Sequence, residues 1–245
     1  MSEVIFVGTS DAFGAGGRRQ SAILLRAKRG AALLDCGPTT LTGLVALQVS
    51  RDEIDSIVIT HYHGDHFGGV PLFLLAAKYG DLRRRPIHIV GPGDVREKIE
   101  AASRALGHPM DEGEWPFEIR YESFDGGGEV AAGPVGIRAF ETNHQADALP
   151  HGVIVDTAGF RIAYSGDTGW FEKLPELVRG TELFISECTL YDGDFPYHLN
   201  YRQLEMHKSK FDCGRIILTH LGPEMTDRRG TCGFETADDG LILKL

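Results

Sequence analysis

Three histidines and an aspartate stand within six positions in the segment His61-Tyr62-His63-Gly64-Asp65-His66. They follow Ile57-Val58-Ile59, a β-branched run that predicts a short buried strand. Side chains two apart in extended backbone point the same way, so His61 and His63 can converge. Asp65 and His66 lie beyond the turn at Gly64 and aim at a neighbouring point. Because zinc-like ions prefer imidazole and carboxylate groups, the segment predicts ligands for two metal ions.

Residues of the same chemical types follow other predicted strands. His144 comes after a strand predicted at Pro134–Phe140, and Asp167 after one predicted at Phe160–Tyr164. His220 ends a strand predicted at Arg215–Thr219. The pairs Thr60-His61 and Thr219-His220 close equivalent apolar strands, which indicates two similarly built halves facing each other across one site. Ligands at the carboxyl ends of strands are typical of open α/β sheets.

Together these strand-end groups suffice for two divalent metal ions. The expected ligands are His61, His63 and His144 for one ion, Asp65, His66 and His220 for the other, and Asp167 as the bridge between them. Each ion keeps an open position for water, as catalytic zinc does. Two such cations can lower the pKa of a bridging water, so that it is present as hydroxide near neutral pH. They can also hold the oxygens of a phosphoryl or acyl centre. The donor types favour zinc, with manganese and iron as alternatives.

Asp35 has two open interpretations at this point. It follows a strand predicted at Ala31–Leu34 and precedes Cys36-Gly37-Pro38. Its carboxylate could cap a helix that begins near Thr39, or it could orient a metal ligand from behind.

The remaining patterns predict an α/β fold of two sheets flanked by helices, in one domain over residues 1–245. Further strands are predicted at Val4–Val7, Ser21–Arg26, Ile87–Val90, Phe117–Phe124, His151–Asp156 and Glu182–Ser186. Helices are predicted over Leu41–Val49, Val70–Tyr79, about 95–106 with Asp94 as its N-cap, and Tyr201–Lys210. Turns are predicted at Gly126-Gly127-Gly128 and Ala158-Gly159.

Charge and cysteine content narrow the function classes. The formal net charge is −10, and the basic clusters are short, Arg18-Arg19 and Arg83-Arg84-Arg85 among them, which argues against a stable grip on a nucleic-acid duplex. The four cysteines form no CxxC pair, and no apolar run approaches the length of a membrane span. We therefore expect a cytoplasmic protein without membrane contact, with a homodimer as the default oligomer.

The histidine-rich segment matches the HxHxDH motif of the metallo-β-lactamase superfamily. His144, Asp167 and His220 follow in the order of that family, and the resemblance extends from Val4 to about Leu221. It implies an αββα four-layer sandwich with a dinuclear site at one edge. It also implies that Asp35 supports this site from behind the metal ligands.

Within that superfamily the chain resembles the phosphodiesterase branch, which includes ribonuclease Z and a cyclic phosphodiesterase. The resemblance rests on Asp35-Cys36-Gly37, on Ser165-Gly166-Asp167-Thr168, and on Ser186-Glu187 followed by His198. It implies that His198, paired with Glu187, donates a proton to the leaving oxygen. Asp65 is expected to act in catalysis as well as in metal binding, and Asn143 is a candidate donor to the developing charge. Without the family, His198 could equally be a residue of a surface loop.

Ribonuclease Z carries a long, Gly-rich basic arm, for which Phe117–His144 leaves no room, and this chain is acidic. We therefore expect a dinuclear metal-dependent hydrolase, a phosphodiesterase that acts on a small or nucleotide-like phosphodiester by hydroxide attack. A thioester or lactone hydrolase on the same site, or a tRNA 3′-processing endonuclease, are the alternatives.

Overall fold

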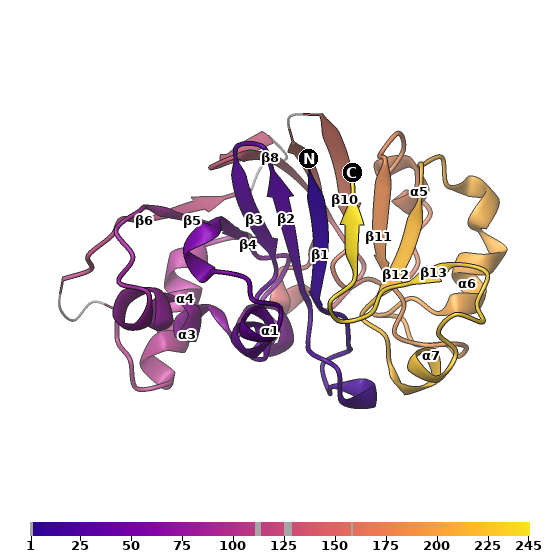
Figure 1. Ribbon diagram of the computed structural model, residues 1–245. Coiled ribbons are helices and arrows are strands. Elements are labelled where there is room, and N and C mark those ends of the chain that lie inside the picture. The colour runs from indigo at the N-terminus through magenta and orange to yellow at the C-terminus, as the bar shows by residue number, and fades with distance from the viewer. Residues whose placement is uncertain (1, 111–113, 125–128, 158) are drawn as a thin grey trace.

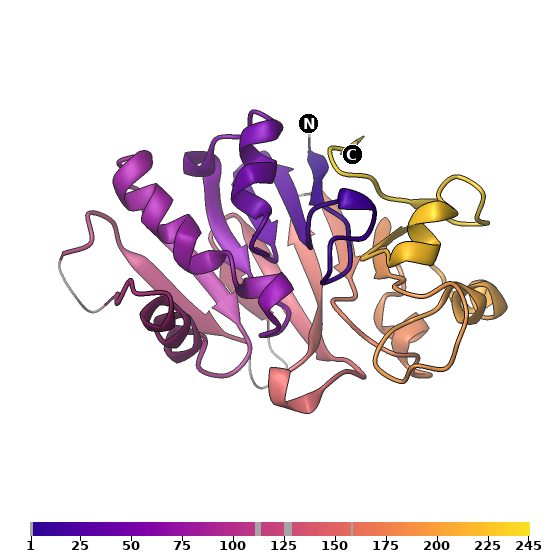
Figure 2. The same ribbon diagram turned by 90° about the horizontal axis from the view of Figure 1, so that it is seen from below.

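The computed structural model describes residues 2–110, 114–124, 129–157 and 159–245. Over these residues the chain forms two seven-stranded sheets with helices on their outer faces (Figure 1). Seen from below, the purple helices of the first half and the orange and yellow helices of the second lie on opposite sides of the molecule (Figure 2). The turns predicted at Gly126-Gly127-Gly128 and at Ala158 lie outside the described residues.

The helices and strands alternate along much of the chain. The strands are β1 (Glu3–Gly8), β2 (Ala22–Ala27), β3 (Gly30–Leu34), β4 (Ile54–Val58), β5 (Ile87–Gly91), β6 (Ile119–Ser123), β7 (Glu129–Ala132), β8 (Val135–Glu141), β9 (His151–Thr157), β10 (Phe160–Tyr164), β11 (Leu183–Glu187), β12 (Ile216–Thr219), β13 (Glu235–Thr236) and β14 (Ile242–Lys244). The α-helices are α1 (Thr40–Ala46), α2 (Gly64–Phe67), α3 (Val70–Leu75), α4 (Val95–Ala105), α5 (Leu174–Leu177), α6 (Tyr201–Met206) and α7 (Pro223–Asp227).

The two sheets share one construction. The first runs in the order β14-β1-β2-β3-β4-β5-β6 and the second in the order β13-β12-β11-β10-β9-β8-β7. In the first, the pairings are antiparallel from β14 to β3 and parallel from β3 to β6. In the second, they are antiparallel from β7 to β10 and parallel from β10 to β13. Each half thus contains several neighbouring parallel strands. In α/β proteins, ligand and active sites lie at the carboxyl ends of such strands.

Side chains along β1 point alternately to the two faces of the first sheet, which shows how the layers are held together. Val4 and Phe6 join the core between the two sheets, whereas Ile5 and Val7 join the core between the first sheet and its helices. This two-sided burial follows from the two-residue side-chain period of a strand. A third cluster, containing Leu174, Leu204 and Met225, packs the second sheet against α5, α6 and α7. The predicted αββα sandwich is confirmed.

Most predicted elements are found within a few residues of their expected bounds. Asp94 caps α4, since its side chain accepts a hydrogen bond from the Glu97 amide at 3.0 Å. The helix predicted at Val70–Tyr79 is present as α3 continued by a π-helical turn at Ala76–Gly80. The strands β7, β13 and β14 and the short helices α5 and α7 were not predicted. No helix among the described residues is long and apolar enough to cross a membrane.

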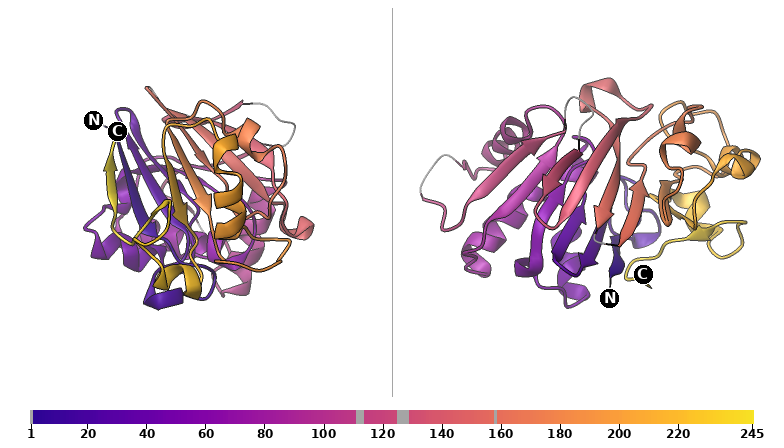
Figure 3. Two further views of the ribbon diagram at one scale, coloured as in Figure 1. Left: turned by 90° about the vertical axis from the view of Figure 1, so that its right-hand side faces the viewer. Right: turned by 90° about the horizontal axis from the view of Figure 1, so that it is seen from above.

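The end of the chain closes the first sheet. Strand β14 pairs with β1 in antiparallel register, with Leu243 opposite Val4, so the two termini lie beside each other (Figure 3). Leu243 is buried in the core between the sheets, while its neighbour Ile242 is half exposed.

We predict that Leu243→Ala lowers the free energy of unfolding by about 2–3 kcal/mol, because it removes apolar contacts and leaves a cavity in the core. The matched change Ile242→Ala on the same strand is expected to cost less than about 1 kcal/mol. Urea titration followed by circular dichroism measures both. Equal losses for the two variants would show that β14 is not seated as described.

Candidate metal centre

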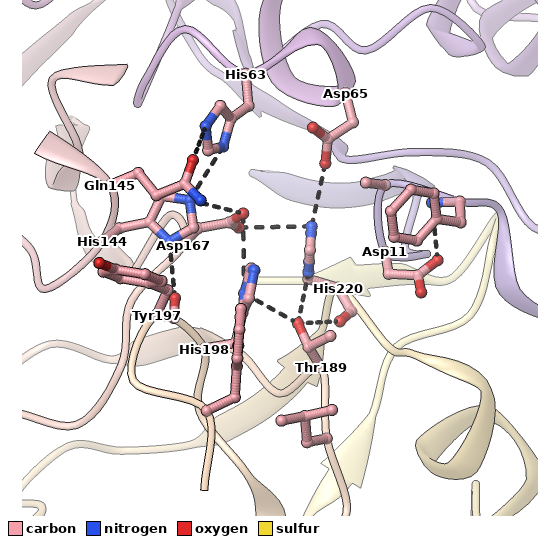
Figure 4. Close-up of a pocket in the computed structure, with 14 residues that line it drawn as sticks. Asp11, His63, Asp65, His144, Gln145, Asp167, Thr189, Tyr197, His198 and His220 are labelled. Atoms are coloured by element: carbon pink, nitrogen blue, oxygen red, sulfur yellow. Dashed lines mark hydrogen bonds and ion pairs between the residues drawn. The ribbon is translucent and has the colours of Figure 1, made fainter. Parts of the chain in front are cut away.

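The metal-ligand candidates come from both sheets and meet between them. His61 follows β4, and the single helical turn α2 then carries Asp65 and His66. From the second sheet, His144 lies beyond β8, Asp167 beyond β10 and His220 directly beyond β12. Because these strand ends share one edge of the sandwich, side chains distant in sequence converge there. Figure 4 shows this for His63, Asp65, His144, Asp167 and His220, which are among its labelled residues.

The candidates form two groups whose ligand atoms lie within 4.8 Å of one another: His61, His63, His144 and Asp167 in one, and Asp65, His66, Asp167 and His220 in the other. In the first, His63 Nδ1 lies 3.2 Å from His61 Nε2 and 3.0 Å from His144 Nε2. In the second, Asp65 Oδ2 lies 3.2 Å from His66 Nε2 and 3.3 Å from His220 Nε2. This is the division predicted from the sequence.

Asp167 belongs to both groups through different oxygens. Its Oδ2 lies 3.6 Å from His61 Nε2, and its Oδ1 lies 3.2 Å from His66 Nε2 and 3.5 Å from His220 Nε2. The carboxylate is buried, and despite that burial the imidazoles of His220 and His66 hold its pKa well below the usual value. It is therefore ionised and oriented toward both groups.

The donor set fits divalent cations. His66 Nε2 and Asp167 Oδ1 are buried without a hydrogen-bond partner, although they face each other. Leaving such atoms unpaired is costly, and a cation between them would satisfy both. Burial and the neighbouring His66 keep the pKa of His61 well below its usual value, so its ring is neutral, the form that ligates a metal. Imidazole nitrogens with carboxylate oxygens suit zinc, manganese and iron alike.

Each of the five histidines is also held at its other ring nitrogen. The partners are Thr60 Oγ1 for His61 (3.1 Å), Gln145 Oε1 for His63 (3.1 Å), Asp35 Oδ2 for His66 (2.7 Å), the Tyr197 carbonyl for His144 (2.7 Å) and Thr189 Oγ1 for His220 (2.8 Å). Such contacts fix the ring orientation and the tautomer of a metal-binding histidine. Of these partners, Gln145, Thr189 and Tyr197 were not predicted, because no sequence pattern marks them.

Asp35 lies behind the second group and is completely buried, with a left-handed φ of 58°. Besides His66, it accepts hydrogen bonds from the Thr60 amide at 2.8 Å and from the Tyr164 hydroxyl at 3.0 Å. It makes no capping contact with α1, whose N-cap residue is Thr39. The helix-cap interpretation is therefore wrong, and the structure places Asp35 where a residue that orients His66 would lie.

Glu187 and His198 are paired at the edge of the site. Glu187 ends β11, is fully buried, and its Oε1 accepts hydrogen bonds from His198 Nδ1 at 2.8 Å and from the Thr168 amide at 2.9 Å. Although burial disfavours the imidazolium, the charge and hydrogen bond of Glu187 raise the pKa of His198 to about 9. The His198 ring stacks on that of His220 at 5.5 Å between centroids, so it is not a free residue of a surface loop.

A cavity of about 470 Å³ opens over these groups. It is lined by Asp11, Ala12, Phe13, His63, Asp65, His144, Gln145, Asp167, Thr189, Leu190, Phe195, Tyr197, His198 and His220. Its volume is in the usual range for a small-molecule site. The contributions of the loop after β1 and of Phe195 and Tyr197 were not predicted. Asn143 does not line the cavity. Its side-chain amide donates a hydrogen bond to the backbone carbonyl of Pro196 at 3.3 Å.

The segment that carries Phe195, Tyr197 and His198 rests directly on backbone near Asp167. A Cβ atom added to Gly169 would lie 1.8 Å from the carbonyl oxygen of Pro196, so only glycine permits this approach. The Gly169 amide also donates to the Asn143 carbonyl at 2.7 Å. Gly169 therefore sets how near the segment comes to the metal-ligand candidates.

Comparisons with known proteins identify the family of this chain. A family model described as Anti-Pycsar protein Apyc1 matches residues 2–237. Ribonuclease BN from Escherichia coli O1:K1 is 27% identical, with 92% of this chain and 91% of that protein aligned. The alignment spans 281 positions, more than the 245 residues of this chain, so ribonuclease BN carries residues that have no counterpart here.

Solved structures show the same architecture. The metallo-β-lactamase fold protein YhfI from Bacillus subtilis superimposes with a TM-score of 0.79 at 20% identity, over 99% of this chain and 98% of that one. The short form of human tRNase Z gives 0.78 at 25% identity, over the same shares. The resemblance to the ribonuclease Z-like branch and the expectation of a hydrolase are thereby confirmed. This chain is a metal-dependent hydrolase of the metallo-β-lactamase fold, and it belongs to the family of the anti-Pycsar protein Apyc1.

Proposed function

We propose that this enzyme is a dinuclear metal-dependent phosphodiesterase that acts on a small or nucleotide-like phosphodiester. The observation that carries the proposal is the Glu187–His198 pair at the edge of the two ligand groups. A phosphodiester has a poor leaving group unless its oxygen is protonated, and a cationic histidine beside the reacting centre can supply that proton.

His61, His63 and His144 would hold one divalent ion, Asp65, His66 and His220 the other, and Asp167 would contact both. When bound, such ions lower the pKa of a water between them and neutralise charge on the phosphoryl oxygens. Zinc is the favoured metal on donor type, and manganese or iron would fit the same set.

The chain's own residues account for the proton transfers. His198 Nδ1 is held by Glu187, which leaves Nε2 to donate a proton to the departing oxygen. Glu187 is anchored in turn by the Thr168 amide and by the amide and hydroxyl of Thr189, so it stabilises the imidazolium without moving. Asp65 uses one oxygen toward His66 and His220, and we assign it the orientation of the attacking water as well as a ligand role.

Charge and length support a small substrate. The chain carries a net charge of −10, and the described residues that line the cavity include no lysine or arginine. A long nucleic-acid strand needs several cations along its backbone, and here it would meet acidic Asp192 and Asp194 in the exposed segment before Phe195. The extra residues of ribonuclease BN also have no equivalent here.

We further propose that residues 1–245 act as one domain in the cytoplasm. Both sheets supply members of each ligand group, so neither half could form the site alone. Cys36, Cys188, Cys213 and Cys232 are all free thiols, which suits a reducing compartment.

The substrate class is tested with bis(p-nitrophenyl) phosphate beside a thioester and a lactone, using protein of known metal content. We predict turnover of the phosphodiester and little or none of the other two. His198→Ala should lower kcat by about 10²-fold or more on a diester with an alkyl leaving group, and by less on p-nitrophenolate, which needs less protonation. His108→Ala, an exposed histidine outside the site, is the control. Preferred thioester or lactone hydrolysis would contradict the proposal.

Metal removal gives a second test. We predict about two divalent ions per chain by elemental analysis. Exhaustive chelation should abolish activity and lower Tm by roughly 5–10 °C, because ions that bind only the folded state stabilise it by mass action. Zinc or manganese should restore both properties. A stoichiometry near one, or a Tm insensitive to chelation, would contradict the two-ion arrangement.

Asp35→Asn tests the support behind His66. Asparagine tolerates the left-handed backbone of this position, so the change mainly removes the negative charge opposite His66 Nδ1. We predict a 10–100-fold loss of metal affinity in competition with a chromophoric chelator. Asp94→Asn, where either residue can cap α4, is the matched control. Unchanged affinity in Asp35→Asn would assign Asp35 a purely structural role.

A further inference from the structure

A second cavity, of about 410 Å³, lies away from the metal centre and is rich in arginine. Its lining includes Arg29, Arg85 and Arg120, together with His88 and Asp55. Asp55 is the single acidic side chain among the described residues that line it. With His88 counted as neutral, the lining therefore carries two net positive charges, although the chain as a whole carries −10. A local reversal of sign inside a concave surface attracts anions.

This arginine-rich cavity lies at the edge of the sandwich opposite the metal centre. Asp55 stands near the beginning of β4 and His61 follows the end of that strand, so the chain between them spans up to about 20 Å. His88 and Arg120 are paired on β5 and β6, and Arg29 stands in the turn between β2 and β3. In Figure 1 that turn lies at the upper edge of the molecule and the loop after β1 at the lower edge. A ligand here would touch none of the residues assigned to the metals.

Arg85 and Asp55 are held firmly in the lining. Arg85 Nη1 donates a hydrogen bond to the Asp52 carbonyl at 2.9 Å, and its Nη2 donates to Asp55 Oδ1. The other oxygen of Asp55 accepts the Ala31 amide at 2.9 Å. A Cβ atom on Gly30 would collide with this carboxylate, so glycine in the turn permits the contact. Both oxygens of the one carboxylate in the lining are therefore already engaged.

Arg29 and Arg120 have donors to offer. Arg29 is exposed and forms no ion pair or side-chain hydrogen bond with any other residue in the described part of the chain. Arg120 Nη2 donates to Glu118 Oε2 at 2.7 Å, and His88 Nδ1 lies 3.4 Å from Glu122 Oε1, but neither glutamate lines the cavity. Because a guanidinium carries five N–H donors in a fixed fork, both arginines can bind an oxyanion in the cavity.

The charge and donor types of the lining fit a phosphate group. Guanidinium forks match phosphate oxygens through paired N–H···O contacts. A phosphate monoester carries close to two negative charges at neutral pH, about the charge that the lining would balance, whereas a carboxylate carries one. The volume of the cavity is in the range of small-molecule sites, so it has room for more than a phosphate ion.

We propose that this cavity is a second ligand site, which binds the dianionic phosphate group of a small molecule, either a phosphate monoester or free phosphate. Arg29 and Arg120 are its anion-binding residues, and Arg85 is held beside them by Asp55. The inference does not depend on which bond the metal centre cleaves, because the two sites share no residue.

Isothermal titration calorimetry of the metal-loaded enzyme with inorganic phosphate tests the site. We predict one phosphate site per chain in addition to any at the metal ions. Arg29→Gln should weaken that site about tenfold or more, because hydrogen bonds to charged groups are strong, and Arg29→Gln with Arg120→Gln should remove it. Inhibition of diester hydrolysis by phosphate, which reports the metal centre, should be unchanged in both variants. Arg29→Gln should also keep its Tm, since Arg29 loses no partner among the described residues.

Lys28→Gln is the matched control. Lys28 is the exposed neighbour of Arg29 in the same turn and does not line the cavity, so this change removes the same charge without touching the site. It should leave phosphate binding unchanged. Equal losses in Lys28→Gln and Arg29→Gln would overturn the inference, because they would show a general attraction of anions to this edge. Unchanged stoichiometry and affinity in Arg29→Gln would overturn it as well.

Ribose 5-phosphate in place of inorganic phosphate separates the two sources of the phosphate group. Tighter binding of ribose 5-phosphate that is lost in Arg29→Gln would support the site and assign it to a phosphorylated small molecule. Equal binding of the two probes, lost in the same variant, would support the site and assign it to the phosphate ion alone. Binding of neither probe outside the metal centre would overturn the inference and leave the phosphodiesterase assignment untouched.

Discussion

The buried carboxylate of Asp167 is the interaction on which the candidate site depends. It arrives from the second sheet, and its two oxygens face His61 and His66 from the first half as well as His144 and His220 from the second. An ionised carboxylate at such depth is costly unless it is surrounded by partners, so its presence requires the imidazoles to be where they are. The two sheets are therefore held in register at this edge by electrostatics as well as by apolar packing.

The same device appears twice around that carboxylate. In the first half, Asp35 ends up behind the site and accepts the Thr60 hydroxyl, which in turn lies against His61. In the second, Glu187 accepts the Thr189 hydroxyl, which lies against His220. Each half thus uses a buried carboxylate and a threonine to hold a histidine. This local similarity agrees with the corresponding order of antiparallel and parallel strands in the two sheets.

How much the sequence predicts depends on how local the information is. The contiguous segment from His61 to His66 indicated metal binding directly, because strand and turn geometry alone bring its members together. His144, Asp167 and His220 were found because each follows a recognisable strand. The edge strands β7, β13 and β14 are too short to carry a periodic pattern, and their pairing depends on the completed sheets. Thr189, Gln145 and Phe13 owe their positions to folded contacts between distant segments, which no local pattern records.

The close backbone contact between Gly169 and Pro196 limits how such an enzyme can change its substrate range. Because no side chain fits at Gly169, the segment that continues from Pro196 to His198 stays at one distance from the metal-ligand candidates. Asp192 and Asp194, which precede Pro196 in the same segment, are exposed, so a change of side chain there meets no such close contact. Evolution or laboratory selection can therefore change the exposed residues beside the cavity while the candidate proton donor His198 remains in place, which would separate the choice of substrate from the chemistry performed on it.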